Sequence, residues 1–217
     1  MTNEEQLFGK TVSIAASGGG RDMKHSPIYL SVDINKPHAL LMFTEYFGSA
    51  LQQLYKDSYH HIVILCIGTD RSTGDCLGPL VGYKMGLTRY QNVFVHGTLD
   101  KPVHAKNLQE TIQHIKDYYY RPFIIAVDAC LGKPERVGTI SIGEGALHPG
   151  AGVNKTLPEI GHLHIVGIVN FGGFMEYMIL QNTRLNLVMK MADTITNGIQ
   201  YNLWKIMKEN NKNVTQK

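Results

Sequence analysis

Three short runs of apolar, mostly β-branched residues occur in the middle of the chain, at residues 61–68, 92–97 and 123–129. They lack the alternation of apolar and polar positions found in half-exposed strands, which is typical of strands buried on both faces of a parallel sheet. The two connecting segments, 78–90 and 104–119, have the length and apolar spacing of helices. This order of elements predicts a three-layer α/β/α sandwich, with helices on both faces of a parallel sheet.

Two further runs extend the predicted sheet. Residues 139–145 follow the third strand after CLGKPERVG, which is too short to return the chain to a parallel neighbour. This strand is therefore predicted to run antiparallel. Residues 162–170 form a fifth predicted strand, and helical spacing fills most of 172–208, with a break at 181–183. The prediction is a five-stranded, mostly parallel mixed sheet with one antiparallel strand.

Composition indicates one compact domain over residues 1–217, with residues 1–35 as a weakly patterned N-terminal extension. Hydrophobic residues make up 43% of the 217 positions, enough for a sizeable core. The net charge of +3 is scattered without a basic block, so no nucleic-acid partner is expected. No apolar run reaches the roughly 18 residues of a spanning helix, and no signal peptide is evident. Three cysteines, an odd number, do not indicate a disulfide framework of the kind found in secreted proteins. We therefore expect a cytoplasmic protein without membrane contact.

Two aspartates stand where the predicted topology would bring them together. Asp75 lies in the loop that leaves the first strand, and Asp128 lies at the end of the third. Parallel strands with helices on both faces commonly take the order 2-1-3, which leaves a crevice at the carboxyl ends of strands 1 and 3. Two carboxyl groups held close together do not both ionise readily, so one stays protonated. Such a pair can act as base and acid at the same pH, as amide hydrolysis requires.

Other roles for these residues remain open from the sequence. Asp75 is also a favoured cap for the helix that follows, and Asp128 is also a favoured turn residue at a strand end. Cys76 and Cys130 directly follow the two aspartates. A cysteine at a helix N-terminus can act as a nucleophile, with a histidine such as His96 as its base. Small buried cysteines are nevertheless more often packing residues.

Three segments carry a resemblance to a known family: TGDCLGP (73–79), AVDACLG (126–132) and LHPGAGVNK (147–155). In order and spacing they resemble the active-site segments of germination protease, an aspartic-type endopeptidase that degrades small acid-soluble spore proteins. The resemblance covers roughly residues 61–180. The whole chain also resembles the YyaC family of sporulation proteins, which are shorter relatives of that protease.

This resemblance implies a site and a substrate. Asp75 and Asp128 match the two essential aspartates of the protease and are the predicted catalytic residues. The glycine-rich loop would border the cleft, with His148, Asn154 and Lys155 as candidate substrate contacts. The implied partners are small acid-soluble spore proteins, the implied location is the forespore or spore core, and no cofactor is expected.

The resemblance also implies a fold shared with the hydrogenase maturation endopeptidases, of the phosphorylase/hydrolase-like type. In those enzymes acidic residues and a histidine bind nickel of the substrate. Here Asn170 stands where that histidine is expected, and Asp75 replaces a glutamate, so no metal site is predicted. Asn170 is kept as a candidate substrate contact. His162 and His164, near the start of the same strand, are interpreted as core or edge histidines.

Two functions from different classes follow from these observations. One is a sporulation-associated endopeptidase of the germination-protease type, which hydrolyses peptide bonds of small spore proteins with an aspartate pair. The other is a non-catalytic sporulation factor that retains the fold and binds a protein or peptide in the cleft. Matching carboxylates alone do not prove turnover. The sequence leaves open whether the protein forms a homo-oligomer.

Overall fold

The computed structural model describes residues 29–86, 90–149 and 158–214, and the described residues contain one six-stranded sheet. The order of strands across the sheet is β1-β5-β6-β4-β2-β3. The strands are β1 (Tyr29–Asp33), β2 (His61–Cys66), β3 (Val93–His96), β4 (Pro122–Gly132), β5 (Thr139–Glu144) and β6 (Leu163–Phe171). β3, β2, β4 and β6 run parallel, and β5 is antiparallel to both of its neighbours.

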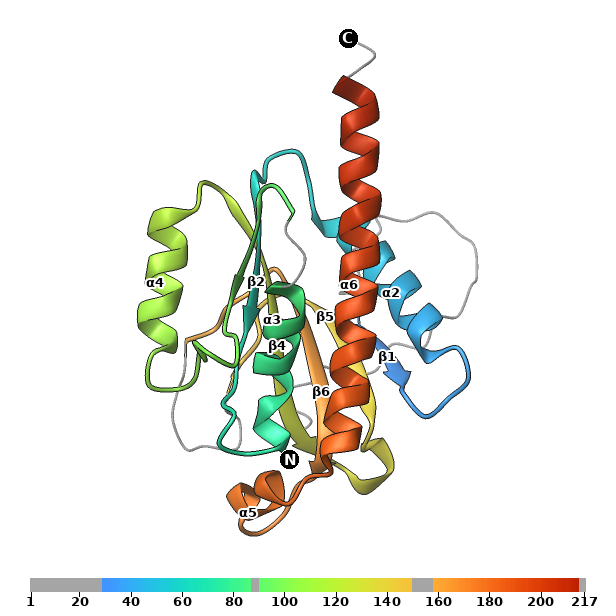
Figure 1. Cartoon of the computed structure of the whole chain (residues 1–217), viewed down its shortest axis with the longest axis vertical. Helices are drawn as coiled ribbons and strands as arrows, with labels where there is room; N and C mark the ends of the chain where they lie inside the picture. The colour runs from blue at the N-terminus through green and yellow to red at the C-terminus, as the bar shows by residue number, and fades with distance from the viewer. Residues whose placement is uncertain (1–28, 87–89, 150–157, 215–217) are drawn as a thin grey trace, which may run out of the picture.

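Helices cover both faces of this sheet, which confirms the three-layer α/β/α prediction. In Figure 1, α4 lies on one side of the sheet, and α2, α3 and α6 lie on the other. The helices are α2 (Ala39–Leu54), α3 (Leu77–Gly86), α4 (Leu108–Tyr118), α5 (Glu176–Gln181) and α6 (Leu185–Val214), with 3-10 turns η1 (Gly74–Cys76) and η2 (Pro134–Arg136). Within the described residues, no helix has the length and apolarity needed to cross a bilayer.

Strand β2 shows why its sequence lacks alternation. Ile62 and Ile64 pack into the core shared with α2, α3 and α6, whereas Val63 and Leu65 pack into the core shared with α4. All four side chains are almost completely shielded from solvent. A strand with apolar neighbours on both faces has no solvent-facing side, so both sets of alternate positions are apolar.

The predicted strand order is confirmed in its central part. β2 pairs in parallel with both β3 and β4, which is the 2-1-3 arrangement of the three apolar runs. The antiparallel direction of β5 is confirmed as well. The predicted helix break at 181–183 is also observed, because α5 ends at Gln181 and α6 begins at Leu185.

The prediction of five strands was wrong, because β1 was missed within the N-terminal extension. β1 pairs antiparallel with β5, from Tyr29 opposite Gly143 to Asp33 opposite Thr139. Of its five residues only Val32 is buried, so the segment carries little hydrophobic signal. The strand is stabilised by its hydrogen-bonded pairing with β5, which is distant in sequence and therefore leaves no signal in the local pattern.

Strand β4 is longer than predicted, which changes the position of one candidate residue. It runs from Pro122 to Gly132 and continues alongside β6 past a register shift between Cys130 and Leu131. Asp128 is therefore inside the strand, opposite Val166 of β6, and not at the strand tip. A buried aspartate within a strand needs a local explanation, because a charge in the core is unfavourable.

Candidate active site

Asp75 is placed by a tight connection between β2 and α3. The chain leaves β2, turns at Gly68, which has a φ of 140°, and reaches η1, where Asp75 lies. The backbone N–H of Thr69 donates a hydrogen bond to the backbone carbonyl of Asp75, at 3.1 Å. A Cβ at Gly78 would overlap the backbone of Ile67, so the start of α3 packs directly on the chain leaving β2. Glycine at this position lets the carboxyl edge of the sheet and the turn carrying Asp75 come together.

The structure does not support a helix-capping role for Asp75. Asp75 lies inside η1, whose N-cap position is taken by Thr73, and α3 follows directly at Leu77. The Thr73 side chain makes no capping hydrogen bond. Asp75 is therefore within the 3-10 turn and does not occupy its N-cap position.

Asp128 is held in the interior of the sheet, with only 8% of its surface exposed. Its Oδ1 accepts a hydrogen bond from the backbone N–H of Ala129, at 2.8 Å. This bond to the next residue is the local contact expected of a turn-forming aspartate, but the backbone here is an extended strand. One bond satisfies only part of the capacity of a carboxylate, which leaves the group to be stabilised by protonation.

The two aspartates interact electrostatically in the folded protein. The pKa of Asp128 is raised well above its ordinary value, mainly by burial and further by the charge of Asp75. The hydrogen bond from the Ala129 N–H acts in the opposite direction and lowers this pKa. The pKa of Asp75 is raised by burial, but the Thr69 N–H and the nearby His104 act in the opposite direction. The pair therefore contains unequal members: Asp128 keeps its proton at a pH where Asp75 is already ionised.

The environment of Cys76 does not favour a nucleophilic thiolate. Burial and the charges of Asp70 and Asp75 all raise the pKa of the Cys76 thiol. His96, the proposed base, instead has its Nε2 2.9 Å from the hydroxyl oxygen of Tyr119. A thiol surrounded by carboxylates is a poor nucleophile near neutral pH, because the reactive form is the thiolate.

Asn170 fastens the end of β6 to the chain around α5. Its side-chain nitrogen donates to the carbonyl of Ile179 and the hydroxyl of Thr183, both at 3.2 Å. Its Oδ1 accepts from the backbone N–H of Phe171, at 2.9 Å. The amide is thus engaged in internal bonds, and its contact with a substrate stays a prediction.

The other predicted substrate contacts lie in or near the glycine-rich loop. Asn154 and Lys155 lie outside the described residues. His148 is exposed, and its Nδ1 lies 3.3 Å from Oε1 of Glu159. A role for these three residues in substrate binding stays a prediction.

The two histidines interpreted as core or edge residues make backbone contacts. His162 Nδ1 accepts a hydrogen bond from the backbone N–H of Ile124, at 3.0 Å. His164 Nδ1 lies 3.1 Å from the carbonyl oxygen of Gly145. In the part of the chain that the structure describes, no three His, Cys, Asp or Glu side chains gather in a way that could hold a metal ion.

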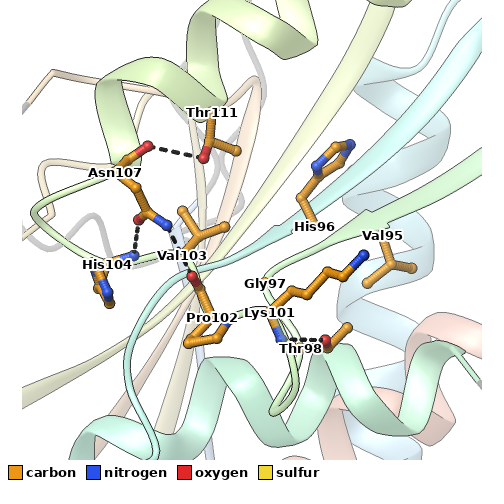
Figure 2. A pocket seen from close by; sticks show the side chains of 10 residues that line it. All are labelled: Val95, His96, Gly97, Thr98, Lys101, Pro102, Val103, His104, Asn107 and Thr111. Atoms are coloured by element: carbon orange, nitrogen blue, oxygen red, sulfur yellow. Dashed lines mark hydrogen bonds between the residues drawn. The ribbon is translucent and has the colours of Figure 1, made fainter.

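Sequence reasoning missed His104, whose electrostatic effect lowers the pKa of Asp75 in the folded protein. The residue was assigned to a helix over 104–119, but α4 begins only at Leu108, and His104 belongs to the loop before it. The same loop lines a cavity of about 500 Å³ (Figure 2). One available signal was topological: loops that follow parallel strands meet at the same edge of the sheet, so the loop after β3 adjoins the loop after β2.

Comparisons with known proteins identify relatives of the chain. Over 138 residues, it is 59% identical to "Uncharacterized protein YyaC" of Bacillus subtilis (strain 168), covering 64% of this chain and 67% of the relative. The predicted relation to YyaC is therefore confirmed. A solved structure of the NiFe hydrogenase maturation protease HycI from Thermococcus kodakarensis KOD1 is similar, with a TM-score of 0.47 and 18% identity, over 72% of this chain and 97% of that chain. Residues 32–198 match the family described as "Protein of unknown function (DUF1256)". Because this match covers most of the chain, the chain belongs to the DUF1256 family.

Proposed function

We propose that the protein is an endopeptidase that hydrolyses peptide bonds with Asp75 and Asp128. The observation that carries this proposal is the pair of interacting carboxyl groups, one of them almost fully buried, at the carboxyl edge of a parallel sheet. Burying two interacting carboxyl groups is unfavourable for folding, so a functional reason for keeping them is expected.

The unequal surroundings of the two groups assign their roles. Asp75, ionised first, accepts a proton from a water molecule, whose oxygen then attacks the carbonyl carbon of the scissile peptide bond. Asp128 donates its proton to the amide nitrogen as the carbon–nitrogen bond breaks. The products are a new carboxyl terminus and a free amine. The proton gained by Asp75 then restores Asp128, either directly or through solvent.

The surface next to the aspartates supports a polypeptide as the substrate. The segment 171–178, which runs from the last residue of β6 into the first turn of α5, exposes five large apolar side chains: Phe171, Phe174, Met175, Tyr177 and Met178. The end of α5 packs on η1, since a Cβ at Gly74 would meet the side chains of Leu180 and Thr183. Clustered exposed apolar side chains are typical of surfaces that bind other proteins. A polypeptide bound over this segment would lie beside the turn that carries Asp75.

Small acid-soluble spore proteins are the proposed substrates, and the forespore is the proposed location. The support for both is the resemblance of segments 73–79, 126–132 and 147–155 to germination protease. The relation to a Bacillus protein is compatible with this proposal.

The test is incubation of the purified full-length protein with small acid-soluble spore proteins between pH 4 and 8, with fragments identified by mass spectrometry. Asp75→Asn and Asp128→Asn variants are the matched controls, because they keep side-chain volume and remove the titrating group. We expect cleavage by the parent with a coupled, bell-shaped pH dependence, and none by either variant. Absence of cleavage by the parent at every pH refutes the proposal.

The second candidate is a non-catalytic protein-binding factor, and the apolar segment 171–178 is the observation that favours it. This function would use the same surface without needing the carboxyl groups. Equal binding of a spore protein by the parent and by the Asp75→Asn/Asp128→Asn double variant, without cleavage by either, would support this candidate.

A further inference from the structure

A cavity of about 500 Å³ opens between the end of β3 and the start of α4. Figure 2 shows His96 and Lys101 on one wall of this cavity, and His104 and Asn107 on the other. A cavity of this size can hold a small organic molecule. The lining residues come from the one stretch of chain that joins β3 to α4: Val95, His96, Gly97, Thr98, Lys101, Pro102, Val103, His104, Asn107 and Thr111.

The polar side chains of the lining favour a negatively charged ligand. They are one lysine, two histidines, two threonines and one asparagine, and none of the ten lining residues is an aspartate or glutamate. Among the residues that the structure describes, no carboxylate forms an ion pair with Lys101. The positive charge of Lys101 is therefore available to a ligand.

The free donors of the lining suit a phosphate group better than a carboxylate. The Oγ1 of Thr98 accepts the backbone N–H of Lys101 at 3.2 Å, so its own O–H can still donate. The Nδ1 of His104 accepts the backbone N–H of Lys106 at 3.3 Å, which in the neutral ring leaves the proton on Nε2. Donors thus stand on both walls (Figure 2). A phosphate group offers three acceptor oxygens in different directions and close to two negative charges, whereas a carboxylate offers two oxygens in one plane and one charge.

The loop that carries these donors is preorganised. The side chain of Asn107 accepts the backbone N–H of His104, at 2.8 Å, and donates to the carbonyl of Pro102, at 3.1 Å. The hydroxyl of Thr111 donates to the carbonyl of Asn107, at 2.9 Å. A loop already fixed in its binding shape loses little conformational entropy when a ligand enters.

The same loop is fastened to the chain that leads from β2 to Asp75. Val103 forms a parallel bridge with Ile67, and its carbonyl accepts the N–H of Gly68 at 2.8 Å. His104 follows Val103 directly, and its electrostatic effect lowers the pKa of Asp75. A nearly doubly charged anion bound at His104 would offset this effect, so Asp75 would ionise only at a higher pH.

We propose that this cavity is a regulatory site that binds the phosphate group of a small molecule through Lys101, Thr98 and His104. Occupation of the cavity keeps Asp75 protonated at a pH where it otherwise ionises, and so inhibits the reaction at the aspartate pair. Asp128, the other titrating group that interacts with Asp75, supplies no positive charge in place of that of His104. The inhibition rests on the proposed endopeptidase function, whereas the binding of phosphate does not.

Binding is tested by NMR on the ¹⁵N-labelled full-length protein near pH 7.5, titrated with glycerol 3-phosphate, inorganic phosphate, glycerol and acetate. We expect both phosphates to shift the amide signals of residues 97–107, glycerol to leave them unchanged, and acetate to bind about tenfold or more weakly. Tighter binding of glycerol 3-phosphate would identify an organic phosphate as the ligand. Equal binding would show that the phosphate group alone is recognised, and both results support the site.

Two lysine variants test whether the binding occurs in this cavity. Lys101→Gln should weaken the binding of both phosphates about tenfold or more, because it removes the charge and keeps most of the side-chain length. Lys190→Gln, whose lysine lies on α6 across the sheet, is the matched control and should bind them as the parent does. Phosphate binding that leaves residues 97–107 unshifted, or that survives Lys101→Gln, overturns the site, as does acetate binding of equal strength.

The regulatory role is tested with two readouts, each with and without saturating glycerol 3-phosphate. The ¹³C signal of the Asp75 carboxyl group should titrate at a higher pH in the presence of the ligand, and Lys101→Gln should abolish this shift. In the cleavage assay, the acidic limb of the pH profile should move in the same direction. An Asp75 titration that does not move while phosphate binds through Lys101 overturns the regulatory role. A titration that moves, with no cleavage by the parent at any pH, refutes the endopeptidase alone.

Discussion

Replacing Asp128 with asparagine should stabilise the protein at neutral pH. The carboxyl group is almost fully buried in β4 and accepts one backbone hydrogen bond, from Ala129. Asparagine has nearly the same shape, and its Oδ1 can accept the same bond. The substitution therefore removes the titrating group with little change in packing.

The magnitude follows from the raised pKa of Asp128. Its ordinary value is 3.8, and burial and the Asp75 charge place the folded value well above this. Between the two values the folded protein holds one proton that the unfolded chain has lost. The free energy of unfolding of the parent therefore falls as the pH rises through this window, by about 1.4 kcal/mol per pH unit, and levels off above the folded pKa. Asp128→Asn removes this pH-dependent loss of stability. The difference in free energy of unfolding between the variant and the parent should therefore grow by the same slope above about pH 4.

The assay is urea unfolding of parent and variant at pH steps from 4 to 8. Other titrating groups cancel in the difference between the two proteins, except Asp75, which interacts directly with Asp128. Asp75→Asn is the matched comparison and should give a smaller rise, because Asp75 is less buried and two nearby groups favour its ionised form. A difference between parent and Asp128→Asn that stays constant across this pH range would refute the assigned protonation of Asp128.

Three further predictions test the site and its support. Cys76→Ala should keep cleavage activity, because the raised pKa of the Cys76 thiol leaves little thiolate in the parent. Loss of activity in a variant whose circular dichroism spectrum is unchanged would support Cys76 as the nucleophile. Gly78→Ala should lower the free energy of unfolding by about 1–3 kcal/mol, because the added methyl group overlaps the backbone of Ile67. A melting temperature equal to that of the parent would contradict this close packing. Phe174→Ser should raise KM for a protein substrate several-fold while leaving the melting temperature nearly unchanged, because the ring is 90% exposed; an unchanged KM would exclude the apolar segment from substrate binding.

The central part of the fold could be predicted because its signals are local. The absence of alternation in β2 and β4 identified strands with two buried faces, and the short connection before β5 identified its direction. β1 could not be predicted in the same way. It has only one buried residue, Val32, and its stability comes from pairing with β5, more than a hundred positions further along the chain.

The sequence by itself determined which carboxyl groups to compare, because Asp75 follows one apolar run predicted to be a buried strand and Asp128 lies at the end of another. Only the tertiary structure decided how the two groups differ. Asp128 lies within β4 and not at its tip, which buries it more deeply than the sequence indicated. The loop that carries His104 is tied to the end of β2 by the N–H of Gly68, which donates to the carbonyl of Val103, and no local pattern in the sequence marked this contact. The physical reason is that the pKa of a group depends on how much solvent is excluded from it and on which charges lie near it. Both are set by segments of the chain that come together only after folding.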